Sequence, residues 1–137
     1  MGHMIDLKAA DGTTFPAYVA GPAGNPKAKG GVVVLQEIFG VNSHIRAVAD
    51  GYAADGYFVV APATFHRVQP GVDLGYTEAD MGTGFGFKTA VEGLPAPGVM
   101  ADIQAAIDHA SQAGKVGIVG YCWGGLLTWR AACSLQG

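Results

Sequence analysis

Close to its end the chain reads Gly120-Tyr121-Cys122-Trp123-Gly124-Gly125, directly after the apolar run 116–119 and directly before a helical pattern. Small residues two positions before and two after a central cysteine follow the G-x-S-x-G pattern of a nucleophile elbow, with cysteine in place of serine. In such a strand–turn–helix the turn is so tight that only small flanking side chains fit, and the central side chain stands above the sheet. The pattern predicts Cys122 as a nucleophile at a helix N-terminus, where free N–H groups and the helix dipole favour the thiolate.

Other interpretations of this glycine-rich stretch compete with the elbow. A phosphate-binding loop requires lysine where this chain has Leu126, and the glycine spacing does not supply the G-x-G-x-x-G of a dinucleotide site. A redox C-x-x-C motif fails because Cys133 lies too far along the chain. A small buried cysteine in a tight turn remains the alternative. The strand–turn–helix context favours the nucleophile, with the backbone N–H of Trp123 available to the oxyanion of a tetrahedral intermediate.

Apolar runs and turn signals predict the order of the elements. Residues 62–98 hold many glycines and little periodicity, which predicts an irregular loop with a short helix. Strands that alternate with helices indicate one α/β domain over residues 1–137, with a doubly wound, mainly parallel sheet. Residues 1–3 resemble the scar of an expression tag. The expected strands are 4–9, 14–20, 32–35, 57–61 and 116–119, a loop is expected at 22–31, and the expected helices run from Asn42 or Ser43 to about Asp55, over 99–110 and over 126–133.

The composition indicates a globular core and argues against two classes of partner. Half of the 137 residues are hydrophobic and 14% are charged. The net charge of −3 and the lack of a basic run argue against nucleic-acid binding. No apolar stretch reaches the roughly 18 residues of a membrane span, and the first residues do not form a secretory signal. Cys122 and Cys133 would lie about 16 Å apart on one helix, too far for a disulfide, so a reducing, cytoplasmic location is expected.

A second candidate segment, Gln36-Glu37-Ile38-Phe39-Gly40, follows the first buried strand. It lies at the carboxyl edge of the expected sheet, where open α/β sheets bind ligands. A glutamate directly beyond a buried strand is unusual, although a solvated loop charge would explain Glu37 equally well. The second oxyanion N–H of α/β hydrolases comes from this loop, which makes the backbone of Ile38 a candidate.

The two motifs together, Q-E-I-F-G-V-N at 36–42 and G-Y-C-W-G-G at 120–125, resemble the dienelactone hydrolase (carboxymethylenebutenolidase) family, cysteine hydrolases of the α/β-hydrolase fold. The segment 61–67 also resembles the family's A-P-D-L-[YF]-x-R region, with Ala63 in place of aspartate. The resemblance implies hydrolysis of a lactone or a small carboxylic ester, with no cofactor and no metal. It implies that Cys122 is the nucleophile and that Glu37 contacts its thiol and accepts the proton. It further implies oxyanion-hole N–H groups at Ile38 and Trp123, and a substrate carboxylate bound by Arg67.

The family pattern also includes an aspartate and a histidine well downstream of the elbow. Only residues 123–137 follow Cys122 here, and none of them is aspartate or histidine. The other candidate bases precede the elbow: His109 is expected to be a solvated helix residue, and His66 is the one considered as a substitute.

In this fold the strand before the elbow is normally central, with further parallel strands beside it. Without those strands, the strand 116–119 should present an unpaired apolar edge. We expect the N-terminal part of an α/β-hydrolase domain, truncated after the elbow helix. The alternative is a catalytically incomplete fragment that folds or functions only in association, either as a homodimer or with a complementing C-terminal fragment. A thiol-reactive sensor is a weaker third possibility.

Overall fold

The computed structural model describes residues 2–22 and 27–137, so residues 23–26 of the expected loop 22–31 lie outside the described residues. Its strands form one sheet in the order β1-β2-β4-β3-β5. β3 pairs in parallel with both β4 and β5, whereas the β1–β2 hairpin joins β4 in antiparallel fashion. The predicted parallel arrangement is confirmed for the three strands nearest the elbow. The strands are β1 (Gly2–Lys8), β2 (Thr14–Ala20), β3 (Gly31–Leu35), β4 (Phe58–Pro62) and β5 (Val116–Gly120).

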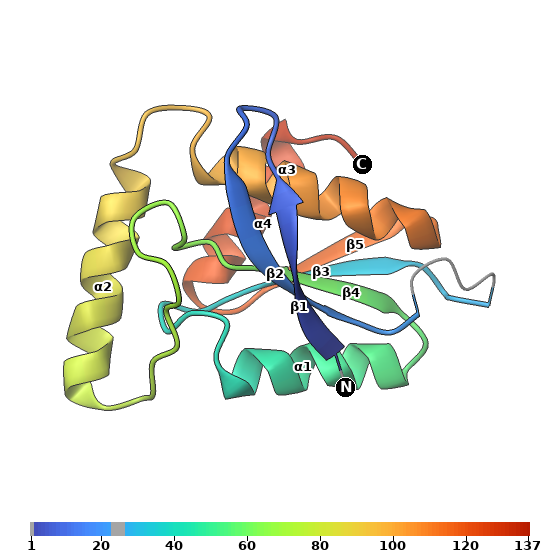
Figure 1. Ribbon diagram of the computed structural model, residues 1–137, viewed down its shortest axis with the longest axis horizontal. Helices are drawn as coiled ribbons and strands as arrows, with labels where there is room; N and C mark the ends of the chain where they lie inside the picture. The colour runs from blue at the N-terminus through green and yellow to red at the C-terminus, as the bar shows by residue number, and fades with distance from the viewer. Residues whose placement is uncertain (1, 23–26) are drawn as a thin grey trace.

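Helices cover both faces of this sheet, as a doubly wound fold requires. α1 (Ser43–Ala54) lies on one face, and α3 (Val99–Ala110) and α4 (Trp123–Ser134) lie on the other (Figure 1). Side chains alternate between the faces along β3: Val33 packs in the core under α3 and α4, and Val34 packs in the core under α1. Because both faces are covered, β3 and β4 are apolar throughout, which is why the sequence shows them as continuous runs.

The helix that follows β3 begins and ends where the sequence predicts. The side chain of Asn42 caps α1 by accepting a hydrogen bond from the N–H of Ile45 at 3.1 Å. The helix ends at Ala54 and is followed by Gly56, whose φ of 103° suits glycine. α4 begins at Trp123, three residues before the predicted helix start, so the elbow leads into the helix directly. Among the described residues, no helix is long and apolar enough to cross a bilayer.

The prediction of an irregular loop with a short helix over residues 62–98 is wrong. Residues 62–98 contain a regular helix of 15 residues, α2 (Glu78–Glu92). Thr77 caps it by accepting from the N–H of Asp80 at 3.1 Å, and acidic side chains occupy its first turn. Three glycines inside the helix each disfavour the helical conformation by about 1 kcal/mol relative to alanine. Their low helix propensity is why the sequence did not indicate a long helix here. α2 lies away from the sheet, on the left in Figure 1, with only Gly84 and Val91 buried.

β5 forms one edge of the sheet, as predicted. Its outer side faces no other strand within the described part of the chain. The strand is only partly covered: Gly117 is exposed, and Val116 and Ile118 are half-buried. Cavities of about 370 and 120 Å³ lie beside it. The neighbouring helix α4 exposes 49% of Leu126 and 71% of Trp129. This end of the molecule therefore carries an apolar surface around an unpaired strand.

Candidate active site

The turn between β5 and α4 has the geometry of a nucleophile elbow. Cys122 adopts φ 55° and ψ −116°, and among the described residues it alone combines a positive φ with a side chain. Such a backbone conformation typically costs about 1–3 kcal/mol and persists only where the surroundings enforce it. The Cys122 side chain is exposed to solvent. The alternative of a small cysteine buried in a glycine-rich turn is therefore wrong.

Two glycines make the tight turn possible. A Cβ atom on Gly120 would overlap the carbonyl oxygen of Gly124, and one on Gly124 would overlap the carbonyl oxygen of Leu35 at the end of β3. By contrast, a Cβ on Gly125 would lie 3.6 Å from the nearest atom, an ordinary contact. The first turn of α4 thus lies directly against the end of β3.

We expect Gly124→Ala to lower the free energy of unfolding by about 1–3 kcal/mol, because backbone atoms must move to admit the methyl group. Gly125→Ala is the matched control. It is expected to leave stability unchanged or to raise it by up to about 1 kcal/mol, since alanine favours the helix. Urea denaturation followed by circular dichroism measures both variants. Equal effects would contradict the close approach of α4 to β3.

The aromatic ring of Trp123 packs inside the protein. The residue is 4% exposed, and its ring stacks on Phe65 with centroids 4.9 Å apart and an interplanar angle of 20°. Phe65 in turn contacts Phe87 of α2 at 5.7 Å. The side chain therefore fixes the start of α4, while its backbone N–H, the first of the helix, donates to no other group among the described residues.

Glu37 lies in the loop after β3, where it binds a residue that the sequence does not single out. The hydroxyl of Tyr76 donates to Glu37 Oε1 at 2.8 Å, and Asn42 Nδ2 donates to the same hydroxyl at 3.2 Å. Burial raises the pKa of Tyr76; the hydrogen bond from Asn42 opposes that shift and the one to Glu37 adds to it. Within the described residues Cys122 has no hydrogen bond to Glu37, so the predicted bond between thiol and carboxylate is not made here.

The segment that carries Tyr76 is attached to the Glu37 loop along its length. The N–H of Leu74 donates to the carbonyl of Phe39 at 2.9 Å, and Asn42 Nδ2 donates to the carbonyl of Leu74 at 3.1 Å. The rings of Phe39 and Tyr76 lie 4.5 Å apart. The loop after β3 is thus held from outside by a segment more than 30 residues further along the chain.

Arg67 is engaged by two carboxylates of the protein itself. Its guanidinium donates to Asp102 at 2.8 and 3.0 Å and to Asp11 at 2.7 and 3.1 Å. Asp102 is fully buried; burial raises the pKa of its carboxyl, and the hydrogen bonds from Arg67 oppose that rise. The hydrogen bond to Arg67 holds the pKa of Asp11 well below its usual range. The predicted contact of Arg67 with a substrate stays a prediction.

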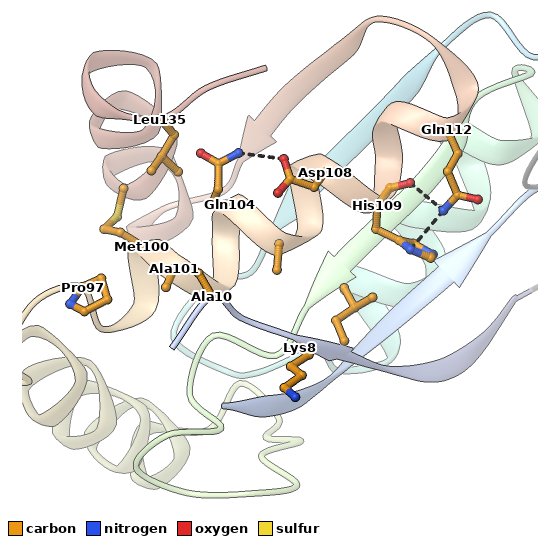
Figure 2. Close-up of a pocket in the computed structure, with 12 residues that line it drawn as sticks. Lys8, Ala10, Pro97, Met100, Ala101, Gln104, Asp108, His109, Gln112 and Leu135 are labelled. Carbon is orange, nitrogen blue, oxygen red and sulfur yellow. Dashed lines mark hydrogen bonds between the residues drawn. The ribbon is translucent and has the colours of Figure 1, made fainter. Parts of the chain in front are cut away.

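A cavity of about 670 Å³ lies elsewhere, along α3 and the end of β1. Figure 2 shows its lining, with Gln104 bonded to Asp108 and Gln112 bonded to His109. None of the predicted site residues lines it. His109 is half-buried: its ring lies 5.7 Å from that of Phe58, burial lowers its pKa, and the residue lines the cavity, so the side chain is only partly solvated.

No group of three or more His, Cys, Asp or Glu side chains that could hold a metal ion occurs in residues 2–22 and 27–137. His66, the substitute base considered above, has a buried Nδ1 without a hydrogen-bond partner in the same ranges, and no hydrogen bond links it to Cys122. The candidate groups that the structure describes at this edge of the sheet are the exposed thiol of Cys122, the N–H of Trp123, and the carboxylate of Glu37, which is bonded to Tyr76.

Comparison with solved structures gives the class of protein. A crystal structure from Klebsiella pneumoniae described as a "Putative Dienelactone Hydrolase" superimposes with a TM-score of 0.68 at 31% identity, covering 95% of this chain and 55% of that one. An esterase from Pyrococcus furiosus has a TM-score of 0.66 at 13% identity, covering 99% of this chain and 46% of that one, which shows the fold alone. With the elbow geometry, these likenesses show the α/β-hydrolase fold.

The family follows from sequence comparison. The dienelactone hydrolase family model matches residues 15–136. A carboxymethylenebutenolidase from Pseudomonas putida is 35% identical over 133 residues, which cover 93% of this chain and 54% of that protein. The chain belongs to the dienelactone hydrolase family. It spans about half the length of the curated relatives that it matches.

Proposed function

We propose that this chain carries the nucleophilic half of a hydrolase that opens a lactone or cleaves a small carboxylic ester. The observation that carries the proposal is the exposed Cys122 side chain, held at a positive φ directly before the first turn of α4. The thiolate attacks the ester carbonyl, the C–O bond to the leaving group breaks, and the acyl group stays on Cys122 as a thioester. Water then releases the acyl group as a carboxylic acid.

The oxyanion formed during attack is stabilised by the backbone N–H groups of Ile38 and Trp123. Two features support this assignment. Neither N–H donates to another group among the described residues. In addition, Gly124 packs against the backbone of Leu35 and Gln36, which brings the start of α4 to the loop that contains Ile38.

Glu37 acts as the proton acceptor of the thiol, and Tyr76 controls when it is available. While Tyr76 donates to Glu37, the carboxylate is held by the loop 74–76. When that bond is released, the carboxylate can turn to the thiol and accept a hydrogen bond from it, which keeps the resting sulfur protonated. The proton moves to Glu37 only as the sulfur attacks the substrate.

Tyr76→Phe is therefore expected to slow alkylation of Cys122 by iodoacetamide at pH 7 by up to about tenfold, because a carboxylate close to the sulfur disfavours the thiolate. The pH profile of alkylation should move to higher pH. Adding Glu37→Gln to the variant should restore the wild-type rate, and Tyr57→Phe serves as the control. An alkylation profile that Tyr76→Phe leaves unchanged would contradict the link between Tyr76 and the thiol.

The release of the acyl group needs a base, which we propose is supplied with its acidic partner by polypeptide outside these 137 residues. The free edge of β5, with the exposed Leu126 and Trp129 beside it, supports association at this place. A complementing C-terminal segment is the first candidate and a second copy of this chain is the alternative. Size-exclusion chromatography with light scattering distinguishes them, since only the second gives a dimer of the chain alone. The free thiols at 122 and 133 fit a cytoplasmic setting.

Mass spectrometry after incubation with p-nitrophenyl acetate tests the proposal. One acetyl group per chain, mapped by peptide digestion to Cys122, is the expected result. A protein that stays unmodified, or that is acetylated elsewhere only, would remove the basis for the hydrolase assignment.

A further inference from the structure

Gln36 is a polar side chain at the very end of an apolar strand, and it is buried, with 1% of its surface exposed. Both the nitrogen and the oxygen of its amide group are hydrogen-bonded. Nε2 donates to the carbonyl oxygen of Glu37 at 2.9 Å, and Oε1 accepts from the backbone N–H of Thr64 at 3.1 Å. The opposite orientation of the amide would bring two donors together at Thr64 and two acceptors together at Glu37, so the partners fix which way it points.

The bond to Glu37 bears on the neighbouring N–H. The carbonyl of Glu37 and the N–H of Ile38 belong to one planar trans peptide unit and point in opposite directions. A group that holds the oxygen therefore also sets the direction of the N–H. Since the N–H of Ile38 has no partner of its own in the described structure, Gln36 restrains it from the other side of the peptide.

The next peptide unit is confined as well. Gly84 of α2 packs so closely on the carbonyl oxygen of Ile38 that a Cβ atom there would overlap it. The loop after β3 is thus held at the Glu37 carbonyl by Gln36 and at the Ile38 carbonyl by α2. Gln36 in turn is held by Thr64, in the loop that follows β4.

We propose that Gln36 is a positioning residue that orients the N–H of Ile38 toward the oxyanion. The proposal rests on the proposed function, in which that N–H is one of two donors. Gln36 itself does not touch the substrate. Its contribution is to remove the freedom of the Glu37–Ile38 peptide to rotate, because a preorganised donor costs no rearrangement when negative charge develops on the substrate oxygen.

Two reactions of the Cys122 thiol distinguish a role of Gln36 in orienting the oxyanion donor from a role in general stability. Acetylation by p-nitrophenyl acetate passes through an oxyanion, whereas alkylation by iodoacetamide displaces iodide and forms none. Gln36→Met is expected to slow acetylation of Cys122 by about 10- to 100-fold, somewhat less than the loss of an oxyanion donor in other enzymes. Alkylation should stay within about twofold of wild type. Gln69→Met, in an exposed loop, is the matched control and should change neither rate.

A second variant covers the case in which Gln36→Met does not fold. A protonated glutamic acid has the shape of glutamine and can donate to Glu37 while it accepts from Thr64; its carboxylate cannot donate. Relative to wild type at the same pH, Gln36→Glu should therefore be acetylated nearly normally at pH 5 and increasingly slowly as the pH rises. Its alkylation relative to wild type should not follow that trend.

Equal losses in acetylation and alkylation would overturn the proposal, because they would mean that the thiol itself has moved. Unchanged acetylation in both Gln36 variants would overturn it too. Failure of the underlying function looks different: the wild-type protein would then show no acetyl group on Cys122 at all.

Discussion

Cys122→Ala is expected to abolish the release of p-nitrophenolate that accompanies acetylation, leaving only the rate of ester hydrolysis in buffer. The wild-type chain should release about one equivalent and then slow, because neither histidine nor aspartate follows the elbow in residues 123–137. Alanine preserves the backbone geometry and removes only the sulfur. The stopped-flow absorbance of p-nitrophenolate measures the amplitude of this burst.

Cys133 provides the matched control, since it is also exposed, lies on the same helix and is not at the elbow. Cys133→Ala should keep the full burst. A burst that survives in Cys122→Ala and disappears in Cys133→Ala would refute the elbow as the reactive site. Steady turnover by the wild-type chain alone would instead indicate that a base is already present, and His66 would then be the first residue to replace.

Arg67→Met is expected to lower the free energy of unfolding by about 3–5 kcal/mol at neutral pH, the cost of leaving a buried carboxylate without its charged partner. Asp102 is fully buried and takes both of its side-chain hydrogen bonds from Arg67. Chemical denaturation at pH 7 measures the loss. Arg46→Met is the control: its partner Asp73 is 56% exposed, and exposed ion pairs contribute at most about 1 kcal/mol.

The same variant should respond to pH in a defined direction. Burial raises the pKa of Asp102, so without Arg67 the folded protein is penalised above that pKa and recovers as the carboxyl is protonated on acidification. In the wild type, the hydrogen bond from Arg67 lowers the pKa of Asp11, so its contribution is present at neutral pH and is lost as the pH falls. Both effects narrow the difference in unfolding free energy between wild type and Arg67→Met as the pH falls, the Asp11 effect only below the ordinary aspartate pKa of about 4. A difference that widened on acidification would contradict the ion-pair cluster as its cause.

The elbow and the strands could be predicted from sequence because their signals are local. The positive φ of Cys122 follows from small residues within four positions of each other, and the buried strands are unbroken apolar runs. The helix α2 was not predicted because the low helix propensity of its glycines suggested a loop. In the structure, the cap at Thr77 and the packing of Gly84 on Ile38 stabilise the helix. In that case tertiary contact outweighed intrinsic preference.

The partners of the site residues could not be predicted, because each lies far along the chain. Tyr76 reaches Glu37 across 39 positions, Thr64 reaches Gln36 across 28, and Asp102 reaches Arg67 across 35. No periodicity links such pairs; they meet only when the chain has folded and helices, loops and strand ends pack together. Sequence reasoning therefore proposed candidate reactive groups and missed the groups that hold them.

The strained backbone conformation at Cys122 lowers the stability of the fold, while the same position holds the proposed nucleophile. Glycine adopts a φ of 55° without steric penalty, so it would relieve the local strain that cysteine maintains. A screen of variants for thermal stability alone would therefore favour Cys122→Gly, which raises stability but removes the sulfur. Engineering of this scaffold for robustness should therefore hold position 122 fixed and seek its gains elsewhere, for example at Gly125, where a methyl group meets no close neighbour.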